Sequence, residues 1–364
     1  HEDIEKEALR IDFGKFAATG GTLCIYMGMS KLEEIVDKLI AGGLPDSKPA
    51  AIVSNGTLPS QRKILGPLKN LVGLAKEKGL GSPAIIFVGN AVGLAGSGDW
   101  FEDRPLFGRR FVVTRPVGQN SRLKKLLENK GAEVLELPLI KILPADDRKL
   151  VAEAFAGIAT YGWIVFTSAN GAREFFNLFF RAFGDIRSFG PMRIACVGET
   201  TASVVRDYNL EVELIPPVST AEDLAQSLVA TESLDSAHVL VITGSRNREI
   251  LVNLLESVGH AIVNTLSVYS TDFSDVSEAA ALQDFREKGA DALVFSSSSA
   301  ALSYVEQEED LVLEKDARVP ILCSFGAQTS ATLKENGLSV DLEAETPSLD
   351  SLVDSLVAKF GRSS

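Results

Sequence analysis

The stretch Phe166-Thr167-Ser168-Ala169-Asn170-Gly171 closes one apolar run, and Phe295-Ser296-Ser297 closes another 129 positions later. Around both stretches the sequence repeats at a nearly constant spacing. Solenoid repeats have periods of roughly 20 to 50 residues, so a repeat of this length has the size of a domain. The sequence therefore predicts two similar units. Eight positions recur in order at an offset of 128: Leu123, Leu127, Gly131, Gly198, Thr201, Thr220, Leu224 and Leu228 match Leu251, Leu255, Gly259, Gly326, Thr329, Ser348, Leu352 and Leu356.

Each copy alternates short apolar strands with leucine-rich helices, beginning with strands at 111–114 and 239–242. Such alternation indicates parallel sheets with helices on both faces. Ligands of these sheets bind beyond the carboxyl ends of the strands. The part before residue 98 also alternates, with strands expected at 22–27, 50–53 and 84–88.

Composition excludes several classes of function. The formal charge of −13 over 364 residues argues against nucleic acid or an anionic membrane as the main partner. Three widely spaced cysteines argue against a disulfide framework and favour a reducing compartment, the cytoplasm. No segment has the pattern of a membrane span or a secretory signal. The chain starts with His-Glu-Asp, which indicates a piece of a longer protein.

Hydroxyl and amide side chains follow the two buried strands quoted above. Ser168 and Asn170 come after one strand, and Ser296 and Ser297 come after the other. The free N–H groups at a helix start, with hydroxyls around them, suit a carboxylate or phosphate. The alternative is ordinary N-capping, which Ser and Thr favour at any helix.

A second pair of candidates follows the next strand of each copy: Gly198 with Thr201, and Gly326 with Thr329. Glycine at such a place lets a ligand approach the backbone. The alternative is a tight turn that needs a positive φ.

Two arginines follow the first strand of each copy. Arg115 comes after Thr114, and Arg246 comes shortly after Gly244. Arginine can bind a carboxylate through two hydrogen bonds, so these four residues complete the candidate substrate site. The alternative for the arginines is an exposed, solvated side chain.

Tyr269 is the candidate acid catalyst, because a phenol can donate a proton to a leaving hydroxyl. Structural burial is the alternative. His238 and His260 have no carboxylate or cysteine at ligand spacing, so no metal site is expected.

Several short motifs from residue 109 onward carry a family resemblance. They are Val112-Val113-Thr114-Arg115-Pro116, the stretch at 166–171, Val197-Gly198-Glu199-Thr200-Thr201-Ala202, Pro217-Val218-Ser219-Thr220-Ala221-Glu222 and Val268-Tyr269. With these motifs, in this order, the chain resembles uroporphyrinogen-III synthase. The resemblance implies two flavodoxin-like α/β domains joined by a two-strand connector, with the active site in the cleft between them. The implied substrate is hydroxymethylbilane, a linear tetrapyrrole with eight carboxylates, and the synthase needs no cofactor.

A second set of motifs lies in the first part of the chain. It consists of Gly21-Thr22-Leu23, Tyr26-Met27-Gly28-Met29, Asn55-Gly56-Thr57, Gln61-Arg62, Pro83-Ala84-Ile85-Ile86-Phe87-Val88-Gly89 and Trp100-Phe101. With these motifs the first 98 residues resemble the C-terminal half of uroporphyrinogen-III C-methyltransferase. The resemblance implies that Met27 and Gly56 contact S-adenosylmethionine in the intact methyltransferase. It also implies an inactive methyltransferase in this chain, since the other half is missing, and a homodimer formed through this remnant.

The joint resemblance predicts domain boundaries, and in the synthase part they are out of phase with the sequence repeat. The remnant covers 1–98 and a linker covers 99–106. One synthase domain combines 107–137 with 272–364, the other covers 144–265, and the connectors are 138–143 and 266–271.

Two other classes of function stay open on the sequence. The first is a two-domain module that binds a small molecule such as a sugar or amino acid without catalysis. The second is a structural fragment whose activities need the absent half.

Overall fold

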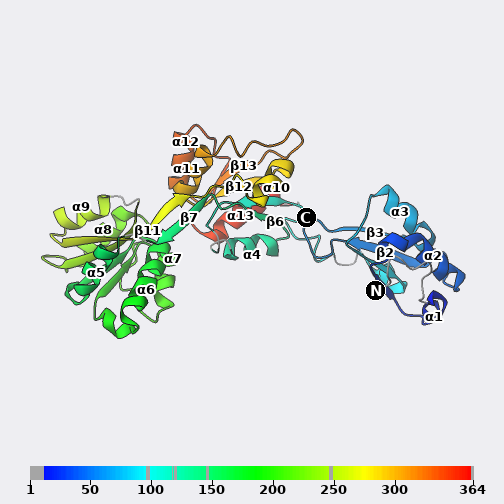
Figure 1. Ribbon diagram of the computed structural model, residues 1–364, viewed down its shortest axis with the longest axis horizontal. Helices are drawn as coiled ribbons and strands as arrows, with labels where there is room; N and C mark the ends of the chain where they lie inside the picture. Colours follow the sequence, from blue (N-terminus) through cyan, green and yellow to red (C-terminus); the bar gives the residue numbers. More distant parts are fainter. Residues whose placement is uncertain are drawn as a thin grey trace. The chain divides into compact units, whose positions relative to one another are not determined.

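A computed structural model of the chain describes residues 12–95, 99–116, 118, 121–144, 147–245 and 249–361. Its strands form three sheets, which Figure 1 colours along the chain from blue to red. By contacts the chain divides into two compact units. One is the chain up to Leu139 together with the part from Asp275 onward, and the other is Ile140–Ser274.

The N-terminal sheet is antiparallel, in the order β1-β4-β2-β3. Strand β3 was not expected, because Gly66 and two charged residues interrupt its apolar pattern. The elements of this N-terminal part are α1 Phe13–Ala17, β1 Leu23–Tyr26, η1 Met29–Lys31, α2 Leu32–Ala41, β2 Pro49–Ser54, β3 Arg62–Pro67, η2 Leu68–Asn70, α3 Leu71–Glu77, β4 Ala84–Val88 and η3 Asn90–Leu94. Helices α2 and α3 pack on one face around Leu39, Ile52 and Leu71, which are fully buried.

The sheet of the unit Ile140–Ser274 has the order β7-β11-β10-β8-β9, and only β7 runs antiparallel. Its elements are β7 Ile140–Pro144, α5 Arg148–Ala156, η4 Ile158–Thr160, β8 Trp163–Phe166, α6 Ala169–Phe183, η5 Ile186–Phe189, β9 Arg193–Cys196, α7 Glu199–Arg206, α8 Ala221–Val229, β10 His238–Gly244, α9 Ile250–Ser257 and β11 Ile262–Phe273.

Both faces of this sheet are covered, as β8 illustrates. Its residues Ile164 and Phe166 face one core, which is rich in phenylalanine from α6. Trp163 and Val165 face the other core, which is filled by leucines of α8 and α9. A strand buried on both faces has no polar side to show, which explains its unbroken apolar run.

The third sheet is parallel throughout, in the order β14-β13-β12-β5-β6. Its elements are β5 Arg110–Val113, α4 Ser121–Asn129, β6 Glu133–Glu136, α10 Ala280–Lys288, β12 Ala292–Phe295, α11 Ser298–Glu306, β13 Ile321–Ser324, α12 Ala327–Glu335, β14 Leu342–Glu343 and α13 Leu349–Phe360. Helices α4 and α13 pack together over one face (Figure 1).

If the five strands of the third sheet are numbered 1 to 5 along the chain, they lie in the sheet in the order 2-1-3-4-5, which is the flavodoxin-like order. The parallel strands of the other unit read 2-1-3-4. The expected fold class, two flavodoxin-like parallel α/β sheets, is therefore confirmed. Repeat-related strands lie in different sheets: β5 and β10 start the two copies, but β10 belongs to the unit Ile140–Ser274.

Two connecting regions have definite structure. The segment 99–106, expected as a linker, buries Phe101 and Leu106, and Lys63 forms ion pairs with Asp99 and Glu102. Strand β7 pairs with the end of β11, from Tyr269 opposite Pro144 to Phe273 opposite Ile140.

At Gly289 the backbone passes directly against the backbone of Arg318, next to the third sheet. The φ of Gly289 is +63°, and a Cβ there would lie 1.8 Å from the carbonyl oxygen of Arg318. Gly337 also has a positive φ, of +80°, but no atom lies near its Cβ position.

We expect Gly289→Ala to lower the free energy of unfolding by more than about 3 kcal/mol, because a φ of +63° with a ψ of −155° is open almost only to glycine and the clash adds to this strain. Gly337→Ala is expected to cost only about 1–2 kcal/mol. Guanidinium unfolding of both variants measures the difference. Equal losses would contradict the close contact.

Candidate functional site

The strand order of each parallel sheet reverses at one place, and ligands of doubly wound sheets bind there, beyond the carboxyl ends of the strands. In the unit Ile140–Ser274 the reversal lies between β8 and β10. The helices that follow these two strands pack on opposite faces, α6 through Phe175 and α9 through Leu255. Ser168 follows β8 and Gly244 ends β10, so both lie at this point.

Tyr269 lies between these two residues. Its phenol oxygen is 3.1 Å from the Ser168 hydroxyl oxygen. A Cβ on Gly244 would be 2.6 Å from Cζ of the same ring. The tyrosine ring therefore occupies the space that a side chain at position 244 would need. The structure thus brings three of the predicted site residues into one cluster.

A β-bulge explains how Tyr269 reaches this position. Thr243 pairs with Ser267, but Gly244 pairs with Tyr269, so Val268 is an extra residue in β11. Bulges redirect side chains and are frequent beside active sites. Here Val268 is fully buried in the core, whereas Tyr269 is only partly buried.

The residues around Ser168 have defined partners. The Ser168 hydroxyl accepts a hydrogen bond of 2.9 Å from the Gly171 N–H, which confirms the capping interpretation for α6. Thr167 donates to the Ile242 carbonyl at 2.9 Å and ties the loop to β10. The Asn170 amide oxygen accepts from Arg173 at 3.3 Å. Anion binding at this helix start stays a prediction.

Gly198 and Gly326 begin α7 and α12 in extended conformations, with φ of −174° and 169°. The alternative of a turn with positive φ is therefore wrong for both. A Cβ on Gly198 would be 2.5 Å from the Ser219 hydroxyl oxygen, so this glycine makes room for the chain's own loop. Thr201 and Thr329 are both buried, with 3% and 6% of each residue exposed.

The third sheet reverses its order between β5 and β12. Thr114 is fully buried and donates its single hydroxyl hydrogen across this point to the Val294 carbonyl at 2.9 Å. Ser297 caps α11 by accepting from the Ala300 N–H at 3.2 Å. Ser296 and Arg115 are partly buried at the same edge, which is where the sequence predicts them. The predicted site residue Arg246 lies outside the described residues.

Two hydroxyl residues at these edges were not singled out from the sequence. Ser219 packs on Gly198 as described. Ser330 is buried and bonds both to Ser324, at 2.6 Å, and to the Glu343 carboxylate. Ser219 lies inside the motif at 217–222, and Ser330 directly follows the candidate Thr329. Only their side-chain contacts distinguish them from neighbouring hydroxyls.

In the N-terminal sheet, Met27 and Gly56 lie at one edge. Strands β1 and β2 are both antiparallel to β4, and Tyr26 and Val53 both pair with Ile85, so the two strands end at the same edge, on either side of β4. Composition alone would place Met27 in a core. Instead its side chain is 66% exposed, and its φ is 53°.

The two residues beside Gly56 share this uncommon backbone, with φ of 52° at Asn55 and 65° at Thr57. Strained backbone of this kind clusters at ligand sites. The edge therefore fits one side of a cofactor site.

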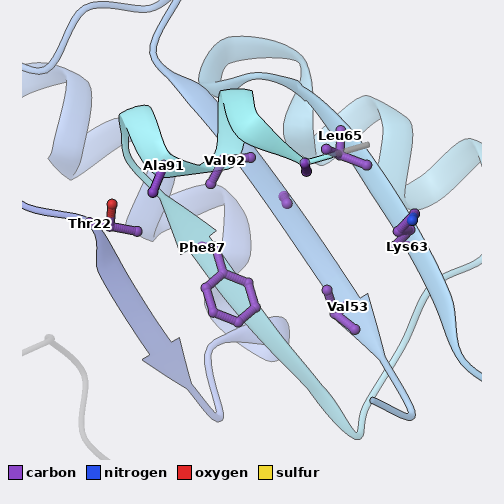
Figure 2. Close-up of a pocket in the computed structure, with 9 residues that line it drawn as sticks. Thr22, Val53, Lys63, Leu65, Phe87, Ala91 and Val92 are labelled. Atoms are coloured by element: carbon purple, nitrogen blue, oxygen red, sulfur yellow. The ribbon is translucent and has the colours of Figure 1, made fainter. Parts of the chain in front are cut away.

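A pocket of about 220 Å³ lies on the sheet face away from α2 and α3 (Figure 2). Val53, Leu65 and Phe87 form its floor, and η3 contributes Val92. Its single charged residue is Lys63, which is paired as described above. The pocket is thus apolar and has no group suited to acid–base chemistry.

Within the described ranges, no three His, Cys, Asp or Glu side chains gather as a metal site requires. No helix in the same part of the chain is long and apolar enough to cross a membrane.

Two doubly wound sheets with hydroxyl-bearing edges define an α/β protein of the kind that binds a ligand at its switch points. The chain belongs to the uroporphyrinogen-III synthase family, because the family model for uroporphyrinogen-III synthase HemD matches residues 121–354. Residues 5–72 match the model for tetrapyrrole (corrin/porphyrin) methylases. The resemblance to a fusion of these two families is confirmed.

Curated relatives cover both parts. The porphyrin biosynthesis protein HemD of Ruminiclostridium josui is 30% identical over 349 residues, which cover 96% of this chain and 68% of that protein. The uroporphyrinogen-III synthase of Synechococcus elongatus is 30% identical over 69% of this chain and 95% of its own length. The uroporphyrinogen-III C-methyltransferase of Bacillus subtilis is 27% identical over 74% of this chain, which spans 56% of that protein.

The three cysteines differ in burial and therefore in the reactivity of their thiols. Burial raises the pKa of Cys196, which ends β9 beside Gly198, to about 12, and it raises the pKa of Cys323 to about 12 as well. Cys24 is exposed. Thiolate is the reactive form, so the two buried thiols should be inert.

We expect one thiol in each native chain to react with a disulfide reagent at pH 8, and all three to react in guanidinium. Cys24→Ala should abolish the native reaction. Rapid native labelling of that variant would contradict the burial of Cys196 and Cys323.

Proposed function

We propose that the chain acts as a uroporphyrinogen-III synthase, which closes hydroxymethylbilane into a ring with inversion of ring D and loss of water. The observation that supports this reaction best is the Tyr269 phenol, held by Ser168 and Gly244 at the switch point of a doubly wound sheet. An acid placed there can assist the departure of the hydroxyl group.

In the proposed step, Tyr269 gives its proton to the hydroxyl of the substrate. The carbon–oxygen bond breaks, both electrons leave with oxygen, and water departs. The methylene carbon and its pyrrole become an azafulvenium cation, whose charge balances the phenolate. The proton released when the new carbon–carbon bond closes the ring then returns to Tyr269.

Carboxylate binding is the second task, because the proposed substrate carries eight carboxylates. Helices α6, α7, α11 and α12 each begin at one of the two switch-point edges, and their first N–H groups can bind anions. We assign this role to Asn170, Ser296 and Ser297, together with the backbone at Gly198 and Gly326. Arg115 and Arg246 are proposed to pair with further carboxylates.

Holding a folded substrate should contribute more to the rate than acid strength does, because closure without inversion occurs spontaneously. Correct orientation of reacting groups can supply about 7–11 kcal/mol of the barrier. A site built from hydroxyls, amides and glycines suits that task.

For the N-terminal part, we propose that Met27 and Gly56 form one side of an S-adenosylmethionine site. The strained turns at 27 and 55–57 support it. A homodimer through this part and a cytoplasmic location are further proposals. The location is supported by three free cysteines.

The rival function is a two-domain module that binds a small molecule without catalysis. Incubation of the wild-type chain with freshly generated hydroxymethylbilane distinguishes this binding module from the synthase. We expect mainly the III isomer of uroporphyrin after oxidation and separation. The I isomer alone, from a folded sample, would favour the binding module.

Replacing the proposed acid tests its role. We expect Tyr269→Phe to lower kcat by about 10-fold or more, a modest acid-catalysis contribution. Tyr161→Phe is the matched control, since Tyr161 precedes β8 and lies at the opposite edge of the sheet. Unchanged kcat in the Tyr269 variant would remove its role.

Methyl transfer tests the N-terminal part. We expect residues 1–364 alone to transfer no labelled methyl group from S-adenosylmethionine to uroporphyrinogen III, because the family resemblance places most of the cofactor site in a half of the methyltransferase domain that residues 1–364 do not contain. Incorporation above a no-enzyme blank would contradict this proposal.

A further inference from the structure

We propose that Ser168 is a positioning residue for Tyr269, one that orients and stabilises the phenol instead of holding a substrate carboxylate. This inference rests on the proposed synthase function and assigns a separate task within that site. Two contacts of the Tyr269 side chain, with Ser168 and with Gly244, carry it together with the bond from the Gly171 N–H to Ser168.

The first observation that supports the inference is the hydrogen-bond capacity of Ser168. A serine hydroxyl has one hydrogen to donate and two lone pairs. One lone pair accepts the Gly171 N–H at 2.9 Å, and the Tyr269 oxygen lies 3.1 Å away. If Ser168 donates to Tyr269, it has no hydrogen left for a carboxylate, which only accepts.

The direction of that bond follows from the reaction. Tyr269 must point its own hydrogen at the leaving hydroxyl, so its oxygen has to accept from Ser168. After proton transfer the phenolate keeps this donor, and hydrogen bonds to charged groups are about twice as strong as neutral ones. Ser168 therefore stabilises the charge that develops in the transition state.

The start of α6 adds to this effect. The Gly171 N–H belongs to the first turn of a 15-residue helix, where the backbone carries partial positive charge. By bonding to Ser168, it polarises the hydroxyl toward Tyr269. Ser297 caps α11 in the same way, through Ala300 at 3.2 Å.

The ring itself is fixed from the other side. The bulge places Tyr269 opposite Gly244, and the ring takes the space of a Cβ at 244. The phenol oxygen is thus held by Ser168 and the ring carbons by Gly244. An alanine at 244 would push Cζ away from its present position and stretch the bond to Ser168.

The test is a double-mutant cycle of Ser168→Ala and Tyr269→Phe, with kcat and KM measured for each variant. We expect Ser168→Ala to lower kcat about 10-fold with little change in KM, and Ser168→Thr to restore most of it. The double variant should be no slower than Tyr269→Phe alone. A raised KM with unchanged kcat, or multiplied effects in the double variant, would overturn the inference.

Loss of the helix cap needs its own control. Ser348→Ala removes a matched cap, because Ser348 accepts from the Ser351 N–H at 3.1 Å at the start of α13. This variant should lose thermal stability without losing kcat. Gly244→Ala gives a second reading: it should lower kcat with the Tyr269 phenol still present, and unchanged kcat would overturn the close fit.

A stability cycle keeps the two proposals apart. The coupling between Ser168→Ala and Tyr269→Phe in guanidinium unfolding reports the hydrogen bond whether or not the chain forms the III isomer. Non-zero coupling without III isomer would remove the proposed function and leave the contact. Zero coupling in an active enzyme would remove the positioning role alone.

Discussion

The pairing of β11 with β10 is the constraint on which the candidate site depends. Twelve residues of β11 run parallel to β10 and then antiparallel to β7, and Tyr269 is the residue where the change occurs. It pairs with Gly244 on one side and with Pro144 on the other. One extra residue before it, Val268, decides which side chain faces the edge of the sheet.

The two flavodoxin-like sheets use their repeated residues mainly for structure. Leu123 and Leu251 fill equivalent cores, and Thr220 and Ser348 cap equivalent helices. The residue proposed as the acid catalyst lies where the two copies of the repeat differ. Both copies provide a capping serine at the switch point, but a tyrosine hydroxyl is bonded to the one at position 168. In our proposal, one edge therefore carries the proton transfer, while both edges bind substrate carboxylates.

Much of the fold was readable from the sequence, because strands buried on both faces appear as unbroken apolar runs and their helices as spaced leucines. The capping role of Ser168 was readable as well, since it follows such a run. The contact of Tyr269 with Gly244 was not, because a bulge depends on strand register, which no local pattern specifies. The packing of Ser219 on Gly198 could not be predicted either, because it also depends on contacts between distant segments. Strand β3 was not predicted because Gly66 interrupts its alternation of apolar and polar residues.

The discontinuous third sheet has a consequence for synthesis of the chain on the ribosome. Strands β5 and β6 emerge early, but β12, the neighbour that β5 requires, is made only after the whole unit Ile140–Ser274. At translation rates of about 5–20 residues per second, making the chain from β5 to β12 takes about 9–36 s, and one edge of β5 is unpaired during this time. The intervening unit is continuous and can fold first. We therefore expect co-translational folding to proceed from the middle of the synthase part outward.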